Sequence, residues 1–130
     1  MSVGVLMVTH PGVGPALLQV VQRMFPNLPL PVGAVEIGYD GTAEQMLPLA
    51  SAAMRKVDQG DGVLLLVDLY GSTPSNVARQ LQQISTRCRR VSALNLPMLL
   101  RVLNYPELDL EGLQAMAAQG GRIGIVLDDA

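Results

Sequence analysis

The chain has 130 residues, of which 49% are hydrophobic, and a formal net charge of −2. This length fits one domain with a substantial core, and a slightly acidic chain lacks the basic face of most nucleic-acid-binding proteins. No apolar run approaches the roughly 20 residues of a membrane-spanning helix, and the N-terminus lacks the basic region and cleavage site of a signal peptide. We therefore expect a cytoplasmic protein with no nucleic-acid partner and no membrane insertion. The single cysteine, Cys88, excludes an internal disulfide, which suits a reducing compartment.

The chain begins with an apolar run and a helical pattern. Residues 3–8 form the run, which ends at Thr9-His10-Pro11-Gly12. In the next segment Leu17, Val21 and Met24 fall on one face, and polar residues fall on the other. This spacing predicts a short strand followed by an amphipathic helix.

A second strand and a second helix are predicted next. Residues 32–37, after a proline-containing break, read as the second strand. Thr42 followed by Gln45 has the spacing of a capping box, which predicts that a helix begins there and ends near Gly60. Pro48 lies inside this helix. Because its ring clashes with the preceding turn, we expect it to bend the helix or to mark a later start.

The second half of the chain continues this alternation. Residues 62–67 are the most apolar strand and show no polar alternation, as expected for a parallel strand that is covered on both faces. Thr73 and Pro74 predict a helix with Thr73 as the N-cap and Pro74 at the first helical position. The basic segment 87–90 is expected to be a solvated turn before a fourth strand at 91–95.

The last third of the chain is predicted to contain two helices and a short strand. Residues 96–103 form a short helical segment, Asp109 can cap a last helix that stops at Gly120-Gly121, and residues 122–127 read as a final strand. Strands that alternate with helices imply right-handed βαβ units and a mostly parallel sheet. We therefore predict a single-domain α/β fold of the flavodoxin-like type, with strand order 2-1-3-4 and helices on both faces.

Two polar residues follow the two most apolar strands. His10 follows the first strand and Asp68 follows the third, and in the predicted order these strands are neighbours whose carboxyl ends border the ligand-binding crevice of such folds. Since neighbouring strands lie about 4.8 Å apart, the two side chains are expected to touch. A carboxylate on Nδ1 fixes the tautomer of an imidazole and leaves the Nε2 lone pair for attack on phosphorus.

The loop after Asp68 adds an anion site. Residues 69–74 are mostly small and run into a helix N-terminus, where free backbone N–H groups and the helix dipole favour an anion. Ser72 and Thr73 add hydroxyl groups. Asp68 could also simply cap a turn, and Ser72 and Thr73 could be turn and cap residues, a role that is compatible with phosphate binding. The sequence thus combines a nucleophile, an orienting carboxylate and an anion site.

These segments resemble a known family. Val8–His10, Leu66–Asn76 and Asn95–Leu99 are similar to the enzyme IIA component of the mannose-class (mannose/fructose/sorbose) phosphoenolpyruvate-dependent sugar phosphotransferase system. The resemblance covers nearly the whole chain, so that residues 1–130 would be one such domain. Its most specific part is the pattern Asp-x-x-Gly-x-[Ser/Thr]-Pro-x-Asn. Pro11 and Ser72 stand where the type member of the family has glycine.

The resemblance implies a phosphotransferase that acts as a histidine phosphoryl carrier. His10 would be phosphorylated at Nε2 by phospho-HPr, Asp68 would hydrogen-bond Nδ1, and an enzyme IIB would receive the group in sugar transport. No cofactor and no metal are expected. The family is typically homodimeric, and residues 123–127 would then add as an antiparallel edge strand to the partner's sheet. The residues expected to bind the phosphoryl group are Thr9, Gly71, Ser72 and Thr73.

Other functions stay open. The protein could be a regulatory IIA of an incomplete phosphotransferase system without sugar transport, or the phosphotransferase subunit of a dihydroxyacetone kinase, although the loop 71–76 fits the mannose class better. A small-molecule-binding module could use the same crevice. A response-regulator receiver is disfavoured because Thr9-His10 stands where receivers need an acidic pair for Mg²⁺. A serine hydrolase is disfavoured because residues 71–74 lack the G-x-S-x-G pattern.

Overall fold

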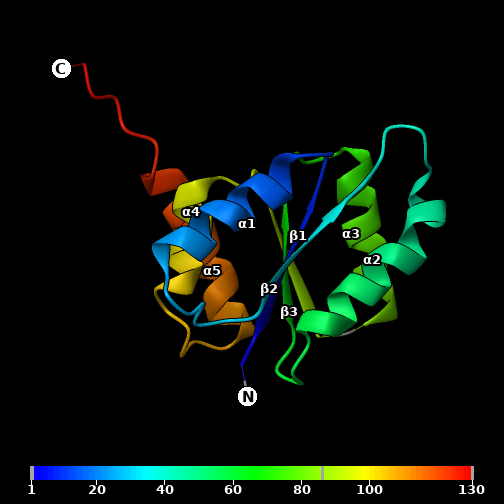
Figure 1. The fold of residues 1–130 in the computed structure, drawn as a ribbon, viewed down its shortest axis with the longest axis horizontal. Helices are drawn as coiled ribbons and strands as arrows, with labels where there is room; N and C mark the ends of the chain where they lie inside the picture. Colours follow the sequence, from blue (N-terminus) through cyan, green and yellow to red (C-terminus); the bar gives the residue numbers. More distant parts are fainter. Residues whose placement is uncertain (1, 86, 130) are drawn as a thin grey trace.

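The computed structural model describes residues 2–85 and 87–129, which form an α/β fold with a central sheet (Figure 1). The elements are, in chain order, β1 (Gly4–Thr9), α1 (Val13–Met24), β2 (Val32–Glu36), α2 (Ala43–Val57), β3 (Val63–Val67), α3 (Thr73–Ile84), β4 (Cys88–Ser92), α4 (Leu96–Leu103) and α5 (Leu110–Ile123). Across the described residues, no helix combines the length and the apolar character that crossing a bilayer requires.

The four strands form one parallel sheet in the order β2-β1-β3-β4, which confirms the predicted topology. β1 lies in the middle, where Val5 pairs with Val32 of β2 and with Leu64 of β3. The sheet continues from β3 to β4 with Val63 opposite Cys88. All four carboxyl ends therefore lie at the same edge, and the segments after β1 and β3 leave it side by side.

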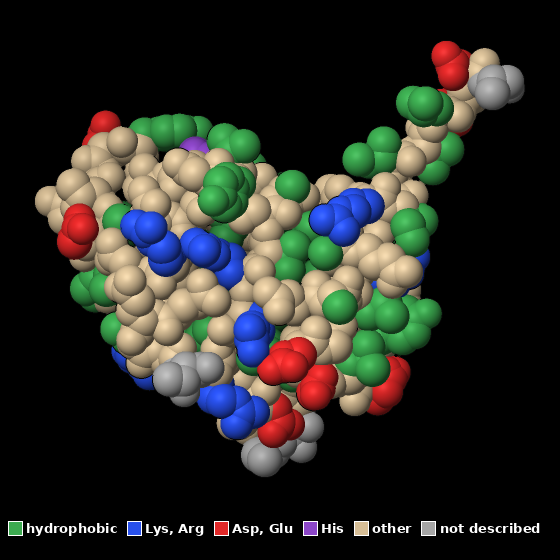
Figure 2. Space-filling model, turned by 180° about the vertical axis from the view of Figure 1, so that it is seen from behind, with side chains coloured by type: hydrophobic (Ala, Val, Ile, Leu, Met, Phe, Trp, Pro, Cys, Tyr) green, Lys and Arg blue, Asp and Glu red, His purple; other side chains and the backbone are tan. Residues whose placement is uncertain are grey.

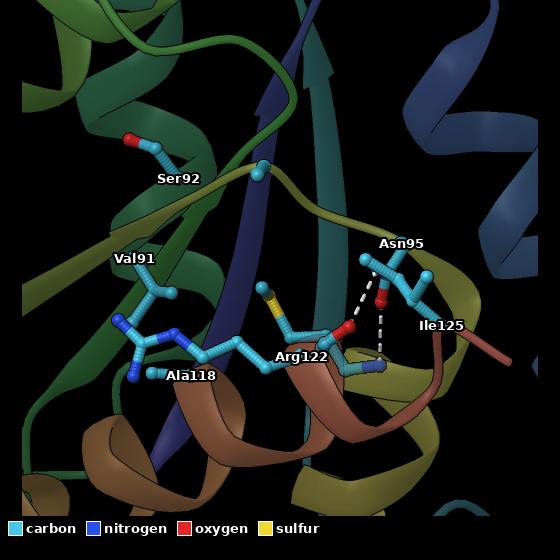
Figure 3. A pocket seen from close by; sticks show the side chains of 9 residues that line it. Val91, Ser92, Asn95, Ala118, Arg122 and Ile125 are labelled. Atoms are coloured by element: carbon cyan, nitrogen blue, oxygen red, sulfur yellow. Dashed lines mark hydrogen bonds between the residues drawn. The ribbon is translucent and has the colours of Figure 1, made fainter.

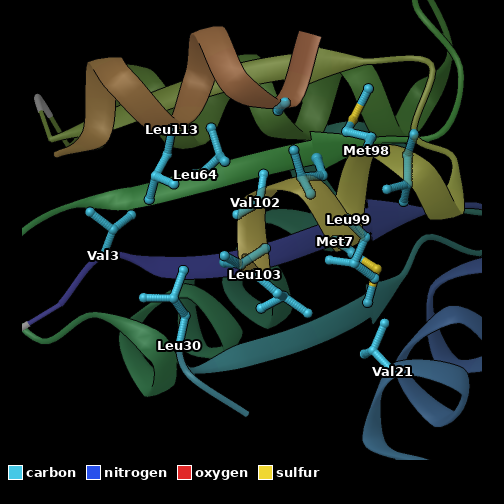
Figure 4. Close-up of a cluster of buried hydrophobic side chains, with 14 of the residues drawn as sticks. Val3, Met7, Val21, Leu30, Leu64, Met98, Leu99, Val102, Leu103 and Leu113 are labelled. Carbon is cyan, nitrogen blue, oxygen red and sulfur yellow. The ribbon is translucent and has the colours of Figure 1, made fainter. Parts of the chain in front are cut away.

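The helices cover both faces of the sheet, with α1, α4 and α5 on one face and α2 and α3 on the other (Figure 1). Successive side chains of a strand point to opposite faces of the sheet. Because helices cover both faces, β1 and β3 are buried along their whole length. Met7 and Leu64 pack with Leu99 of α4 and Leu113 of α5, as Figure 4 shows. On the other face, alternate residues of the same strands pack against α2 and α3. The two cores hold the sheet rigid beneath the loops at its carboxyl edge.

The helix starts are set by side-chain caps. α2 begins as predicted: the Thr42 hydroxyl accepts from the Gln45 N–H, and the Gln45 side chain accepts from the Thr42 N–H. The helix continues through Pro48, so a later start at this proline is wrong. At α3 the predicted N-cap is wrong by one position. Ser72, not Thr73, accepts from the Ser75 N–H, and Thr73 is the first helical residue.

The fourth strand begins earlier than the sequence analysis expected. β4 spans Cys88–Ser92 and includes Arg89 and Arg90, which were expected in a turn. An edge strand tolerates charged side chains because one side of it is open to water. Arg89 contacts Glu111 of α5 at 2.9 Å, and the Arg90 guanidinium donates to the Ser75 carbonyl. These contacts outside the sheet explain why the arginines fit in a strand.

The last helix is longer than predicted. α5 runs to Ile123 instead of stopping at Gly120-Gly121, and residues 124–129 form no strand within this chain. The two glycines serve packing rather than termination. A Cβ at Gly120 would overlap the Arg101 side chain, and one at Gly121 would lie 3.0 Å from the Met98 side chain. They let α5 lie close against α4.

Candidate active site

His10 and Asp68 meet at the carboxyl edge of β1 and β3, as the strand order requires. The distance between His10 Nδ1 and Asp68 Oδ2 is 2.9 Å. An ionised carboxylate only accepts hydrogen bonds, so Nδ1 carries the hydrogen and Nε2 keeps its lone pair. The same oxygen accepts from the His10 backbone N–H at 3.0 Å. Asp68 therefore fixes both the ring and the backbone of His10, and the histidine side chain stays 28% exposed.

The other carboxylate oxygen, Asp68 Oδ1, is buried and has no hydrogen-bond partner among the described residues. A buried oxygen without a donor is costly, because it has lost its hydration. Two donors thus converge on Oδ2 while Oδ1 has none. Asp68 therefore binds His10 through Oδ2 alone.

The segment between β1 and α1 is held by side chains from three directions. Thr9 is fully buried, and its hydroxyl donates to the His10 carbonyl at 2.8 Å and accepts from the Gly14 N–H at 2.9 Å. The Gly12 N–H donates to Glu36 Oε2 at 2.6 Å. Gly12 itself has φ +89 and no side chain to cap α1. The backbone that carries His10 is thereby fixed on both sides of the histidine.

In the loop between β3 and α3, by contrast, several backbone N–H groups have no acceptor in the described part of the chain. The Ser72 hydroxyl donates to the Leu69 carbonyl at 2.6 Å and caps α3. Gly71 has φ +81, a conformation that glycine adopts without strain. Thr73 is exposed, and its hydroxyl has no partner among the described residues. Among the described residues, no acceptor binds the backbone N–H groups of Leu69, Tyr70, Gly71 and Thr73.

Exposed aromatic and aliphatic side chains lie on the segments that follow β2 and β3, near the histidine. The Tyr39 ring lies with its centroid 6.0 Å from that of His10, inclined by 34°. Tyr39 and Tyr70 are each 78% exposed, and Leu69 is 59% exposed. Figure 2 shows the histidine, in purple, at the edge of the molecule with hydrophobic side chains, in green, on either side. Large exposed apolar side chains around a reactive group are typical of a surface that a protein partner covers.

Comparison with known proteins identifies the family. Residues 4–117 match the family described as PTS system fructose IIA component, EIIA-man. The chain belongs to this family. It is also 27% identical over 127 residues to the PTS system mannose-specific EIIAB component of Escherichia coli K12, covering 96% of this chain and 39% of that protein. The chain thus spans about two fifths of the length of this relative.

Solved structures of IIA proteins share the fold. The mannose/sorbose-specific IIA subunit from Enterococcus faecalis superposes with a TM-score of 0.87 at 22% identity, covering 100% of this chain and 97% of the other. The phosphotransferase system component EIIA from Streptococcus agalactiae gives 0.81 at 22% identity, with 95% of each chain covered. These matches confirm the fold class predicted for this IIA-family chain.

A pocket of about 400 Å³ lies away from His10, between β4, α4 and α5 of this IIA-family chain. It is lined by Val91, Asn95, Arg122 and Ile125 among others, and Figure 3 shows the Asn95 amide bound to the Gly121 carbonyl on its wall. β4 is the edge of the sheet on this side. The pocket therefore follows the open edge where the predicted last strand would have to pair.

The structure brings together most of the residues predicted for the site. His10 and Asp68 touch, Gly71 lies on the loop that follows Asp68, and Thr73 is the first residue of α3. Thr9 is buried behind the histidine. The contact of Glu36 with Gly12 is not predicted by the sequence. The feature that could have indicated this contact is the acidic residue at the carboxyl end of β2, which lies opposite Thr9 in the ladder.

Proposed function

We propose that the protein is a phosphoryl carrier of a sugar phosphotransferase system, in which His10 accepts the phosphoryl group at Nε2. The observation that carries this proposal is the contact of 2.9 Å between His10 Nδ1 and Asp68 Oδ2. It leaves Nε2 as the only nucleophilic ring nitrogen, on a side chain that is partly open to solvent. Membership of the IIA family supports the same chemistry.

The transfer is a single displacement at phosphorus. The Nε2 lone pair forms the new P–N bond while the P–N bond of the donor phosphohistidine breaks, and its electron pair returns to the donor nitrogen. The hydrogen on Nδ1 stays in place, so the phosphorylated ring carries a positive charge. Asp68 stabilises this charge through the hydrogen bond that is already formed, which requires no rearrangement during the reaction.

The phosphoryl oxygens are received by the loop between β3 and α3. The N–H groups of Gly71 and Thr73 and the exposed Thr73 hydroxyl supply donors there, at a helix N-terminus that favours an anion. The hydroxyl hydrogens of Thr9 and Ser72 already serve the carbonyls of His10 and Leu69. These two residues shape the site, and the Ser72 hydroxyl would have to leave Leu69 in order to bind phosphate directly.

The donor that we propose is phospho-HPr, and the acceptor is an enzyme IIB in the cytoplasm. The exposed side chains of Tyr39, Leu69 and Tyr70 form the apolar rim that such proteins would cover. A purely regulatory role would use the same donor and no IIB. Copurification with a kinase instead of a IIB would favour the subunit of a dihydroxyacetone kinase.

We also propose that the chain forms a homodimer in which the end of each chain adds to the sheet of its partner. The tail exposes Ile125, Val126 and Leu127, with 74%, 68% and 87% of their surface accessible, and projects from the body of the protein (Figure 1). A strand needs a partner for its backbone groups. The open edge of β4 and the pocket beside it offer that partner.

The proposed function is tested by phosphorylation in vitro. The protein is mixed with enzyme I, HPr and labelled phosphoenolpyruvate, and the label is followed on the wild type and on His10→Ala. We expect acid-labile label on the wild type, as for a phosphohistidine, and none on the variant. Full labelling of His10→Ala would refute the proposal, and so would a folded wild type that takes up no label.

A further inference from the structure

The backbone donors around His10 are already used within the protein. The N–H of His10 is bound by Asp68, that of Gly12 by Glu36 and that of Gly14 by Thr9. The N–H of Val13 donates to the His10 carbonyl at 3.3 Å, and Pro11 has no N–H. The start of α1 therefore offers no free amide to an anion.

The Glu36 carboxylate completes the capping of α1 by binding the Gly12 N–H, whereas the Thr9 hydroxyl binds the Gly14 N–H. The N-cap of α1 is Gly12, which has no side chain, and the first turn of this helix contains no acidic residue. A cap normally satisfies one of the free amides at a helix start and is worth about a fivefold change in an equilibrium constant. Here the cap comes from a different element, the end of β2.

The backbone of Glu36 is fixed by the sheet. It lies opposite Thr9 in the parallel ladder between β1 and β2, and the Ile37 N–H donates to the Thr9 carbonyl at 2.8 Å directly after it. Its bond to Gly12 joins a backbone N–H to a carboxylate at a helix start, which is a charge-assisted hydrogen bond. The residue is nevertheless exposed. The Gly12 N–H and the Glu36 carboxylate could both bind water instead, so burial does not force this contact to form.

We infer that Glu36 is a positioning residue for the reaction of His10, an inference that rests on the proposed function. Its carboxylate fixes the turn His10-Pro11-Gly12 from the side opposite to Asp68. It also occupies the amide of Gly12, which would otherwise compete with the loop after β3 for the incoming phosphoryl group. Two carboxylates thus hold the backbone of the histidine between them, one on its own N–H and one on the N–H two residues later.

The test compares Glu36→Gln, which keeps an acceptor without the charge, with Glu36→Ala, which removes the acceptor. Glu107→Ala is the matched control, because Glu107 is exposed and lies before α5, in a loop far from His10 in the sequence. Single-turnover phosphorylation with excess phospho-HPr gives the saturating rate constant and the half-saturating donor concentration for each protein.

We expect Glu36→Ala to lower the saturating rate constant about five- to tenfold, Glu36→Gln to recover most of this loss, and Glu107→Ala to match the wild type. The half-saturating concentration should stay unchanged. A wild-type rate in Glu36→Ala would overturn the inference. So would a raised half-saturating concentration at an unchanged rate, since Glu36 would then contact the donor protein instead of positioning the histidine.

The amide signal of Gly12 in a ¹H–¹⁵N spectrum gives a readout that needs no phosphorylation. A charged acceptor at short distance shifts an amide proton downfield, and we expect this shift to be lost in Glu36→Ala and partly kept in Glu36→Gln. A Gly12 signal that does not respond to either change would overturn the inference. If the wild type takes up no phosphate, the proposed function fails, and the Gly12 signal alone then decides whether Glu36 holds the turn.

Discussion

Replacing Asp68 with Asn tests whether this carboxylate sets the reactive form of His10. Asn has almost the same shape, but its NH₂ group cannot accept from Nδ1–H. If that group faces the ring, the hydrogen moves to Nε2 and the nucleophilic lone pair is lost. If the amide oxygen faces the ring, the charge that stabilises the phosphorylated imidazole is still missing. Both orientations slow the reaction.

The size of the effect follows from the contacts of Asp68. Its Oδ2 accepts two hydrogen bonds from His10, at 2.9 Å and 3.0 Å. Only the bond to Nδ1 strengthens when the ring becomes charged, and a hydrogen bond to a charged group is worth about 1.5–3 kcal/mol. The rate constant of phosphorylation should therefore fall by roughly 10- to 100-fold.

The assay is transfer from phospho-HPr at saturating donor, with Asp40→Asn as the control. Asp40 is exposed, lies on the loop after β2 and forms no hydrogen bond within the described residues, so this variant removes the same charge from the same end of the sheet. We expect Asp40→Asn to react like the wild type. Equal rates for Asp68→Asn and the wild type would show that the contact with Nδ1 has no part in the chemistry. Equal losses in the two variants would assign the effect to net charge.

Two further predictions concern the thiol and the tail. Burial raises the pKa of the Cys88 thiol, so a disulfide reagent at pH 8 should modify the native protein far more slowly than the urea-unfolded chain, and equal rates would contradict the burial. Because the folded state holds this proton more tightly than the unfolded state, the free energy of unfolding should fall as the pH rises above about 8.5, and this fall should be smaller in Cys88→Ala. Deleting residues 124–130, which lie beyond the last helix, should convert a dimer to a monomer in light scattering without loss of secondary structure; a dimer of unchanged affinity would refute the exchange of the tail.

The contact at the centre of the site could be predicted because it depends on topology alone. Two apolar runs without alternation, 3–8 and 62–67, indicated buried parallel strands, and the predicted order made them neighbours. A residue just after each strand then had to lie at the same edge. His10 and Asp68 are 58 positions apart in the chain, and the strand order nevertheless brings their side chains to 2.9 Å.

The parts that were predicted wrongly depend on tertiary packing. Glycine often follows the last turn of a helix, so Gly120-Gly121 indicates a helix end, but here a side chain at Gly120 would collide with Arg101 of α4 and one at Gly121 would crowd Met98. Arg89 and Arg90 were placed in a turn because they are charged. Their partners, Glu111 and the Ser75 carbonyl, belong to other elements and cannot be inferred from the local sequence.

The contact between Glu36 and Gly12 escaped prediction for a related reason. A capping box within one helix has a fixed spacing in the sequence, as at Thr42 and Gln45. A cap that comes from another element has no such spacing. It depends on the ladder register, which sets Glu36 opposite Thr9.

The two loops at the sheet edge differ in how many of their backbone amides are free to bind an anion. Both loops run from a strand into a helix, and on that ground alone either helix start would attract a phosphoryl group. The loop before α1 has its amides bound by Asp68, Glu36 and Thr9, whereas the loop before α3 keeps those of residues 69–71 and 73 free of protein acceptors within the described chain. Under the proposed function, the loop before α1 presents the nucleophile and offers no free amide, whereas the loop before α3 supplies the amides for the phosphoryl oxygens. We expect this division of roles to let His10 accept a phosphoryl group and release it again, because hydrogen bonds that hold the oxygens can be replaced by those of a partner protein.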